Sequence, residues 1–261
     1  MIGFLLRKTL YDLWDNMFRI VLLNLGFAAA TAIPVFLPQL AAKFFSSIVL
    51  EIALTAIGIL ICSVYLAAAS FSLKSISDYG SFGFGDFFRA LKAAWPAGLV
   101  MGFFVFLIFL VATVIIPFYL SMEIPIAGLA LAAVIFWVAF FALLSFQFYF
   151  TVYARLGSNL KKSFRKCMII SLDNSGFSLF LLLFNIFALA LSVIFAFIFP
   201  GPAAVLLCLD EALRLRLLKY DWLEANPDAN RRKIPWDALL IDEREKTGTR
   251  TLKNFIFPWK D

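Results

Sequence analysis

Residues 98–119 read GLVMGFFVFLIFLVATVIIPFY, a run of 22 residues without a charged side chain. A run of about 20 apolar residues is long enough to cross the hydrocarbon core of a bilayer as an α-helix. A membrane-spanning β-strand would instead alternate polar and apolar residues over about ten positions. The run therefore predicts a transmembrane helix in an all-α membrane protein.

Similar runs recur along the chain, which is 63% hydrophobic and only 15% charged, with a mean hydropathy of +0.92. Soluble proteins carry about 25% charged residues. We expect a polytopic helical bundle with six spans, and five as the alternative because charges interrupt the last run. The expected spans are residues 18–40, 47–73, 97–120, 125–153, 177–199 and 201 to about 220.

An amphipathic helix is expected over residues 3–17, ahead of the first span. Its apolar side chains share one helical face, with the charged side chains largely off that face, a pattern typical of a helix at the membrane surface. The apolar side chains are Leu6, Leu10, Leu13, Trp14 and Met17.

The distribution of Lys and Arg predicts the orientation. With the N-terminus inside and six spans, 22 of the 23 basic residues fall on the inner side and only Lys43 falls outside. Basic residues near span ends are retained in the cytoplasm, so both termini are expected to be cytoplasmic. We expect a transmembrane bundle with its interfacial helix over residues 1–222 and a cytoplasmic tail over residues 223–261; five spans would place the basic tail outside.

Charged residues inside a membrane are costly and are therefore functional candidates. The last expected span contains Asp210, Glu211 and Arg214. Asp210 and Arg214 lie four residues apart, so they share a helical face and can form an ion pair. In the alternative interpretation the membrane part ends near Leu209, and the basic side chains extend to the lipid headgroups.

Other polar candidates lie within the spans and in the inner loops. Asn24, Gln147 and Asn185 are interpreted either as hydrogen-bonding groups between helices or as parts of a polar pathway. The basic inner segments would attract anionic lipid headgroups, at about 1 kcal/mol per charge, or bind a cytoplasmic partner. Their residues are Arg89, Lys92, Lys161, Lys162, Arg165 and Lys166.

The sequence contains no recognisable catalytic set. It has no histidine, its three cysteines are far apart, and HExxH, GxSxG and paired-carboxylate arrangements are absent. We therefore expect a non-enzymatic protein with no catalytic residues, no metal site and no cofactor. The pI of about 9.3 follows from the basic inner loops and does not require a nucleic-acid partner.

Several short segments resemble the YesL-like family of bacterial membrane proteins of unknown function. They are Leu22-Leu-Asn24-Leu with Ile33-Pro34-Val35, Asp86-Phe-Phe-Arg89, Ala154-Arg155 with Asn159-Leu-Lys161, and residues 201–218. Asp210 and Glu211 depart from the neutral polar residues expected in the closing helix. The resemblance implies the bacterial cytoplasmic membrane and a link to carbohydrate ABC transporters, but it implies no catalytic residues.

Three functions compete. The leading hypothesis is an accessory or regulatory component of a carbohydrate ABC transport system, with membrane lipids and transporter subunits as partners. The alternative is a transporter or permease subunit with a path near Asn24, Gln147, Asn185 and Asp210, although no clear EAA-type motif is present. The third hypothesis is an enzyme for lipid-linked substrates, which would have to use Asp210 and Glu211.

Overall fold

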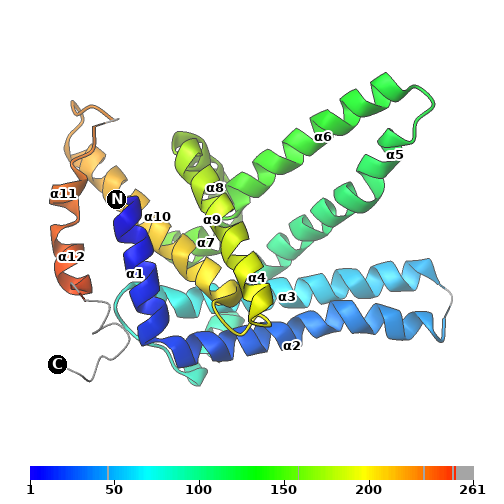
Figure 1. The fold of residues 1–261 in the computed structure, drawn as a ribbon, viewed down its shortest axis with the longest axis horizontal. Coiled ribbons are helices and arrows are strands. Elements are labelled where there is room, and N and C mark those ends of the chain that lie inside the picture. Colours follow the sequence, from blue (N-terminus) through cyan, green and yellow to red (C-terminus); the bar gives the residue numbers. More distant parts are fainter. Residues whose placement is uncertain (46, 158, 232, 249, 251–261) are drawn as a thin grey trace.

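The computed structural model describes residues 1–45, 47–157, 159–231, 233–248 and 250, and this part of the chain contains helices and no strands. The all-α prediction is confirmed. The helices form two long arms, one over residues 17–77 and one over residues 84–146, and each arm is a pair of antiparallel helices (Figure 1). Shorter helices gather at the end that holds the N-terminus.

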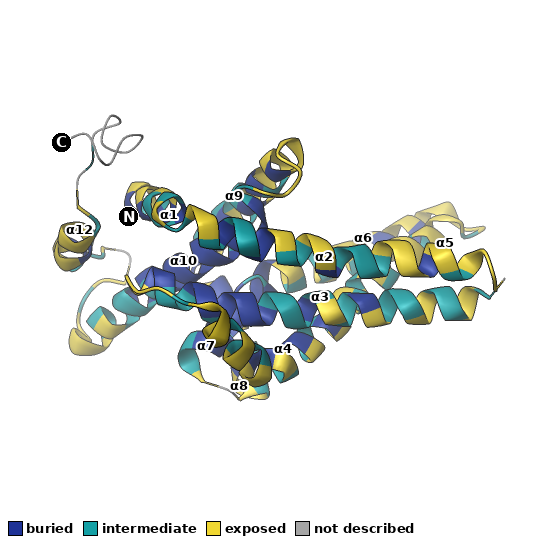
Figure 2. Ribbon diagram, turned by 90° about the horizontal axis from the view of Figure 1, so that it is seen from below, coloured by how far each residue is buried: buried dark blue, intermediate teal, exposed yellow. Residues whose placement is uncertain are grey.

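Five helical segments are long and apolar enough to cross a membrane, which makes this a multi-pass membrane protein. Many of their Phe, Leu, Ile and Val residues are exposed. Figure 2 shows exposed positions along the long helices, as expected for contact with lipid. The segments are α2 (Met17–Ala42), α3 (Ile48–Ser77), Phe84–Leu120, Pro125–Leu156 and α9 (Ser175–Ile194). The third comprises α4 (Phe84–Leu110), a π-helix (Val111–Ile115) and α5 (Ile116–Leu120), and the fourth comprises α6 (Pro125–Phe146) and α7 (Tyr149–Leu156).

The expected sixth span begins at Gly201 but is not among these five segments. It forms α10 (Gly201–Ala225), of which 15 residues are buried. Its neighbours are α1 (Ile2–Asp15), α2, α3, α7 and α9. By length and composition the structure thus fits the five-span alternative, with α10 as a central helix surrounded by protein.

The position of the α9–α10 turn explains why the tail lies beside the N-terminus although the number of long apolar helices is odd. The α2–α3 and α5–α6 turns lie at the far right of Figures 1 and 2, whereas the α9–α10 turn lies beside the first part of α2. The chain therefore returns toward α1 without reaching the far end. Arg250 binds the carboxylate of Asp15 in α1 at 2.6 and 2.7 Å.

We call the end formed by α1, the α3–α4 loop and the tail helices the N-terminal end. The tail contributes α11 (Trp236–Leu239) and α12 (Ile241–Thr247), and Leu240 between them is fully buried. The segment between α7 and α9 forms α8 (Leu160–Asp173). The tail is therefore packed around Leu240, most of the described residues from 226 to 235 are exposed, and residues 251–261 of the expected tail lie outside the described residues.

Small residues bring the helices of the two arms close together. A Cβ atom at Gly98 in α4 would lie 2.4 Å from the Cα atom of Val64 in α3, and one at Gly58 would lie 2.4 Å from the Cβ atom of Pro34. Such contacts are a common means of helix packing in membranes, where burial of apolar surface adds little.

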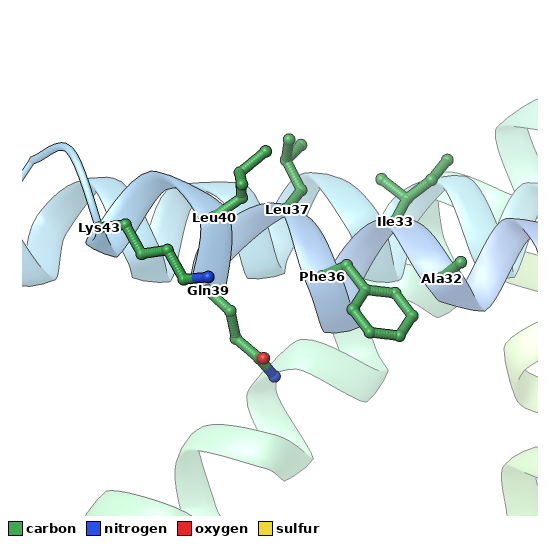
Figure 3. A pocket seen from close by; sticks show the side chains of 7 residues that line it. All are labelled: Ala32, Ile33, Phe36, Leu37, Gln39, Leu40 and Lys43. Carbon is green, nitrogen blue, oxygen red and sulfur yellow. The ribbon is translucent and has the colours of Figure 1, made fainter.

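Beyond these contacts the arms separate toward their outer ends (Figure 1). A mostly apolar hollow of about 510 Å³ lies along the outer half of α2, with Gln39 and Lys43 as its polar groups (Figure 3). Its walls come from α2 alone. The hollow is therefore a feature of the lipid-facing surface, remote from the charged residues of α10.

Candidate functional site

Helix α10 carries adjacent acidic residues that reach different neighbours. Successive residues of an α-helix point about 100° apart. Accordingly, Asp210 faces α3 and α7, whereas Glu211 faces α1. Both side chains are almost completely buried. A buried carboxylate is tolerated only when charged or hydrogen-bonding partners surround it, and each has its own set.

Asp210 is held by Arg155 at the end of α7. Arg155 Nε donates to Asp210 Oδ1 at 2.8 Å, and Arg155 Nη2 donates to Oδ2 of the same carboxylate. Arg155 Nη2 also donates to the Ser77 hydroxyl at 2.9 Å. This two-bond geometry is the strong form of an arginine–carboxylate pair.

The pair continues into a chain of alternating charges. Asp78 Oδ1 accepts from Arg155 Nη1 at 3.0 Å and from Arg214 Nη1 at 3.1 Å. Arg214 Nη2 donates to Glu243 Oε1 of the tail at 2.6 Å. We call these five residues, Asp78, Arg155, Asp210, Arg214 and Glu243, the α10 network. Because opposite charges alternate, each charge in the network has a partner that offsets part of the cost of its burial.

The predicted pairing of Asp210 with Arg214 is wrong. Each residue instead pairs with another element of the fold. Arg155, Asp78 and Glu243 could not be predicted as partners, because each lies at or beyond the end of an apolar run, where a charge requires no partner. Helical spacing identifies neighbours within one helix, but it gives no information about which loop end a helix will face.

A second cluster surrounds Glu211. Thr9 Oγ1 donates to Glu211 Oε2, and Lys8 Nζ lies 3.6 Å from Oε1 while also binding Asp12. Lys8 is only 2% exposed. The helix α1 therefore uses its polar face, as well as apolar residues, to pack on α10.

A third cluster lies near the end of α10. Lys219 Nζ donates to Asp173 Oδ2 and to Asn174 Oδ1, both at 2.9 Å. Arg216 donates to Asn174 Oδ1 at 3.1 Å, and its guanidinium lies 3.7 Å from the ring centre of Phe177. The interpretation that the basic side chains of this helix extend to headgroups is therefore wrong for these two buried residues.

Asn24 anchors the α9–α10 turn. Its Nδ2 donates to the carbonyls of Ile198 at 3.0 Å and Pro200 at 2.8 Å, and its Oδ1 accepts from the backbone N–H of Ala203 at 3.0 Å. Gly201 lies against this amide with φ +67°, where a Cβ atom would lie 2.2 Å from Asn24 Nδ2. Asn24 thus satisfies backbone groups that the turn and the helix start leave free.

The other amides are also placed within helix packing. Gln147 Nε2 donates to the carbonyls of Leu144 at 2.9 Å and Ser178 at 3.0 Å. Asn185 is 5% exposed, and its Oδ1 has no hydrogen-bond partner among the described residues. The cavities of about 370, 390, 500 and 510 Å³ in the described structure include none of Asn24, Gln147, Asn185 or Asp210 in their walls.

The basic residues expected to bind lipid or a partner are mostly on the surface. Lys161, Lys162 and Arg165 of α8 are exposed, while Lys166 is half-buried and donates to the Leu156 carbonyl. Arg89 and Lys92 of α4 are exposed, and Arg89 pairs with Asp86. In the part of the chain that the structure describes, no group of His, Cys, Asp and Glu could hold a metal ion.

Comparison with known proteins finds no matching family model, no similar curated protein and no similar solved structure. The resemblance to the YesL-like family stays a prediction.

Proposed function

We propose that this protein is a non-enzymatic component of the bacterial cytoplasmic membrane that serves as an accessory or regulatory subunit of a carbohydrate ABC transport system. The resemblance to the YesL-like family supplies the class of partner. The structure supports the proposal through a contrast between two sets of basic residues.

Arg214, Arg216 and Lys219 in α10 bind protein groups inside the fold. The second set, Lys161, Lys162 and Arg165 in α8, is exposed and has no ion-pair partner among the described residues. Exposed charges of one sign favour association with a surface of opposite charge. The α8 set is therefore our candidate for partner binding.

The arrangement of the polar residues favours this proposal over its alternatives. A transport path needs polar groups that face a common space, whereas Asn24 and Gln147 bind backbone groups at separate helix contacts. An enzyme needs an accessible acid or base, whereas the Asp210 and Glu211 carboxylates are buried against Arg155 and Thr9.

The test is a pull-down of the tagged full chain from native membranes in a mild detergent, with mass-spectrometric identification of the recovered proteins. We expect ABC transporter subunits in near-stoichiometric amount. Recovery of the protein alone, after crosslinking in the membrane as well as without it, would contradict the accessory role and favour an autonomous transporter.

A further inference from the structure

An apolar slot of about 500 Å³ opens at the N-terminal end between the first turns of α2 and α4. Tyr65 of α3 contributes to its wall, and its hydroxyl donates to the Leu23 carbonyl at 2.8 Å. Gly26 leaves room for this ring, because a Cβ atom there would lie 2.2 Å from the Tyr65 hydroxyl oxygen. The slot is thus built by fixed contacts. Its apolar lining includes Phe18, Leu22, Tyr65, Phe84, Phe87 and Phe88.

Arg19 is the charged residue in the lining of this slot. Its Nη1 donates to Asn16 Oδ1 at 2.9 Å, and it has no ion-pair partner among the described residues. The nearby acids of α1 are already occupied, since Asp12 pairs with Lys8 and Asp15 pairs with Arg250. A guanidinium has five N–H donors in a planar fork that suits a phosphate group.

The slot lies at the depth where a phospholipid headgroup is found. Arg19 is in the first turn of the first apolar helix, and basic and aromatic residues at span ends lie at the headgroup level. Phe18, Phe84 and Phe88 are 75%, 71% and 66% exposed around the opening. A phosphate at Arg19 would therefore leave its acyl chains beside the apolar walls.

The charge around the opening selects the kind of lipid. Lys92 is exposed one helical turn after Phe88, and the described residues provide it with no ion-pair partner. Asp86, the acid at the start of α4, is bound to Arg89 and to the Gly83 N–H. The surroundings therefore favour a headgroup with net negative charge over a zwitterionic one.

We infer that this slot binds one anionic phospholipid, with the phosphodiester on Arg19 and an acyl chain between the aromatic side chains of α2, α3 and α4. The inference does not depend on the proposed role in transport. It requires both a charge and an apolar cavity, and each can be removed separately.

The experiment is a titration of the purified, delipidated full chain with phosphatidylglycerol or phosphatidylcholine of the same acyl chains, followed by native mass spectrometry. We expect one phosphatidylglycerol to bind more tightly than phosphatidylcholine. Arg19→Gln should weaken phosphatidylglycerol binding about fivefold, as expected for about one charge at a lipid surface, and Arg19→Lys should restore much of it. Leu22→Trp should reduce binding of both lipids by filling the slot.

Arg7→Gln, which removes an exposed charge from α1, is the matched control and should leave this lipid bound. Variants are compared only after their monodispersity and thermal midpoints match the parent protein; if Arg19→Gln fails this check, Leu22→Trp and the comparison of the two lipids still test the inference. Equal binding of the two lipids, or no effect of Arg19→Gln or Leu22→Trp, would overturn the inference. Displacement by glycerol phosphate would also overturn it, since the site would then bind a soluble phosphate.

Discussion

Arg155 and Asp210, 55 positions apart in sequence, form a two-bond ion pair that joins the end of α7 to the middle of α10. The Asp210 side chain has no exposed surface, and that of Arg155 is 10% exposed. The pair therefore fixes the position of a central helix that packs against α1, α2, α3, α7 and α9.

Loss of either member should destabilise the fold. Asp210→Ala would leave the buried Arg155 charge without its partner, and breaking such a pair costs about 3–5 kcal/mol. The combined Arg155→Met, Asp210→Leu variant should recover much of this loss. Thermal and denaturant unfolding in detergent measure the stability of the single and double variants. Arg89→Met, which breaks an exposed ion pair, is the control. A double variant less stable than either single variant would contradict the structural role of this pair.

Asn24 should control the α9–α10 turn. Asn24→Leu would leave the Ile198 and Pro200 carbonyls and the Ala203 N–H without their partner, and an unsatisfied buried group costs about 1–3 kcal/mol. Hydrogen exchange should become faster over residues 195–204. Asn185→Leu is the matched control: because Asn185 Oδ1 has no described partner, this change should be neutral or stabilising. If Asn185→Leu destabilised the protein more than Asn24→Leu, the role assigned to Asn24 would be refuted.

Glu243 should hold the tail against the bundle. It accepts from Arg214 Nη2 at 2.6 Å and from the Tyr79 hydroxyl at 2.9 Å. Glu243→Gln should weaken both contacts and increase proteolytic cleavage between residues 226 and 248, with little change in the unfolding of the spans. Glu245→Gln, at an exposed position in the same helix, should cleave like the parent protein. If the two variants were cleaved at the same rate, contacts other than those of Glu243 would hold the tail.

Asp173 should make stability depend on pH. Burial raises the pKa of this carboxyl, but hydrogen bonds from Lys219 and Tyr220 outweigh burial and hold the pKa below its usual value. Because the folded-state pKa is depressed, the stabilisation is present above the unfolded pKa of about 3.9 and is lost as pH falls through the folded pKa. Thermal midpoints measured from about pH 6 to pH 3 should fall less steeply for Asp173→Asn. If the thermal midpoint of Asp173→Asn fell with pH as steeply as that of the parent protein, Asp173 would not be the source of the pH dependence.

The apolar helices could be predicted from the sequence because burial in lipid depends on composition and length. The span expected at 97–120 corresponds to the segment Phe84–Leu120, and the one expected at 47–73 to α3. The α10 segment could not be predicted in the same way. Its mixture of Leu, Ala and charged residues suits both a membrane helix that ends early and a helix surrounded by protein.

The candidate site was only partly predictable for a related reason. Asp210 and Glu211 stand out in the sequence because an apolar run surrounds them, and the structure does bury them. Their partners Arg155 and Lys8 do not stand out, because a basic residue beside a span also satisfies the preference for cytoplasmic charge. Identifying the partners requires the distances between helices that are remote in sequence.

The central claim is that the α10 network holds the fold while the basic residues of α8 bind a partner. The most direct measurement is quantitative recovery of ABC transporter subunits with two variants of matched expression: Arg155→Met with Asp210→Leu, and Lys161→Glu with Lys162→Glu and Arg165→Glu. We predict that the first variant keeps its partners and that the second loses them. Loss of the transporter subunits with the first variant and their retention with the second would contradict the account.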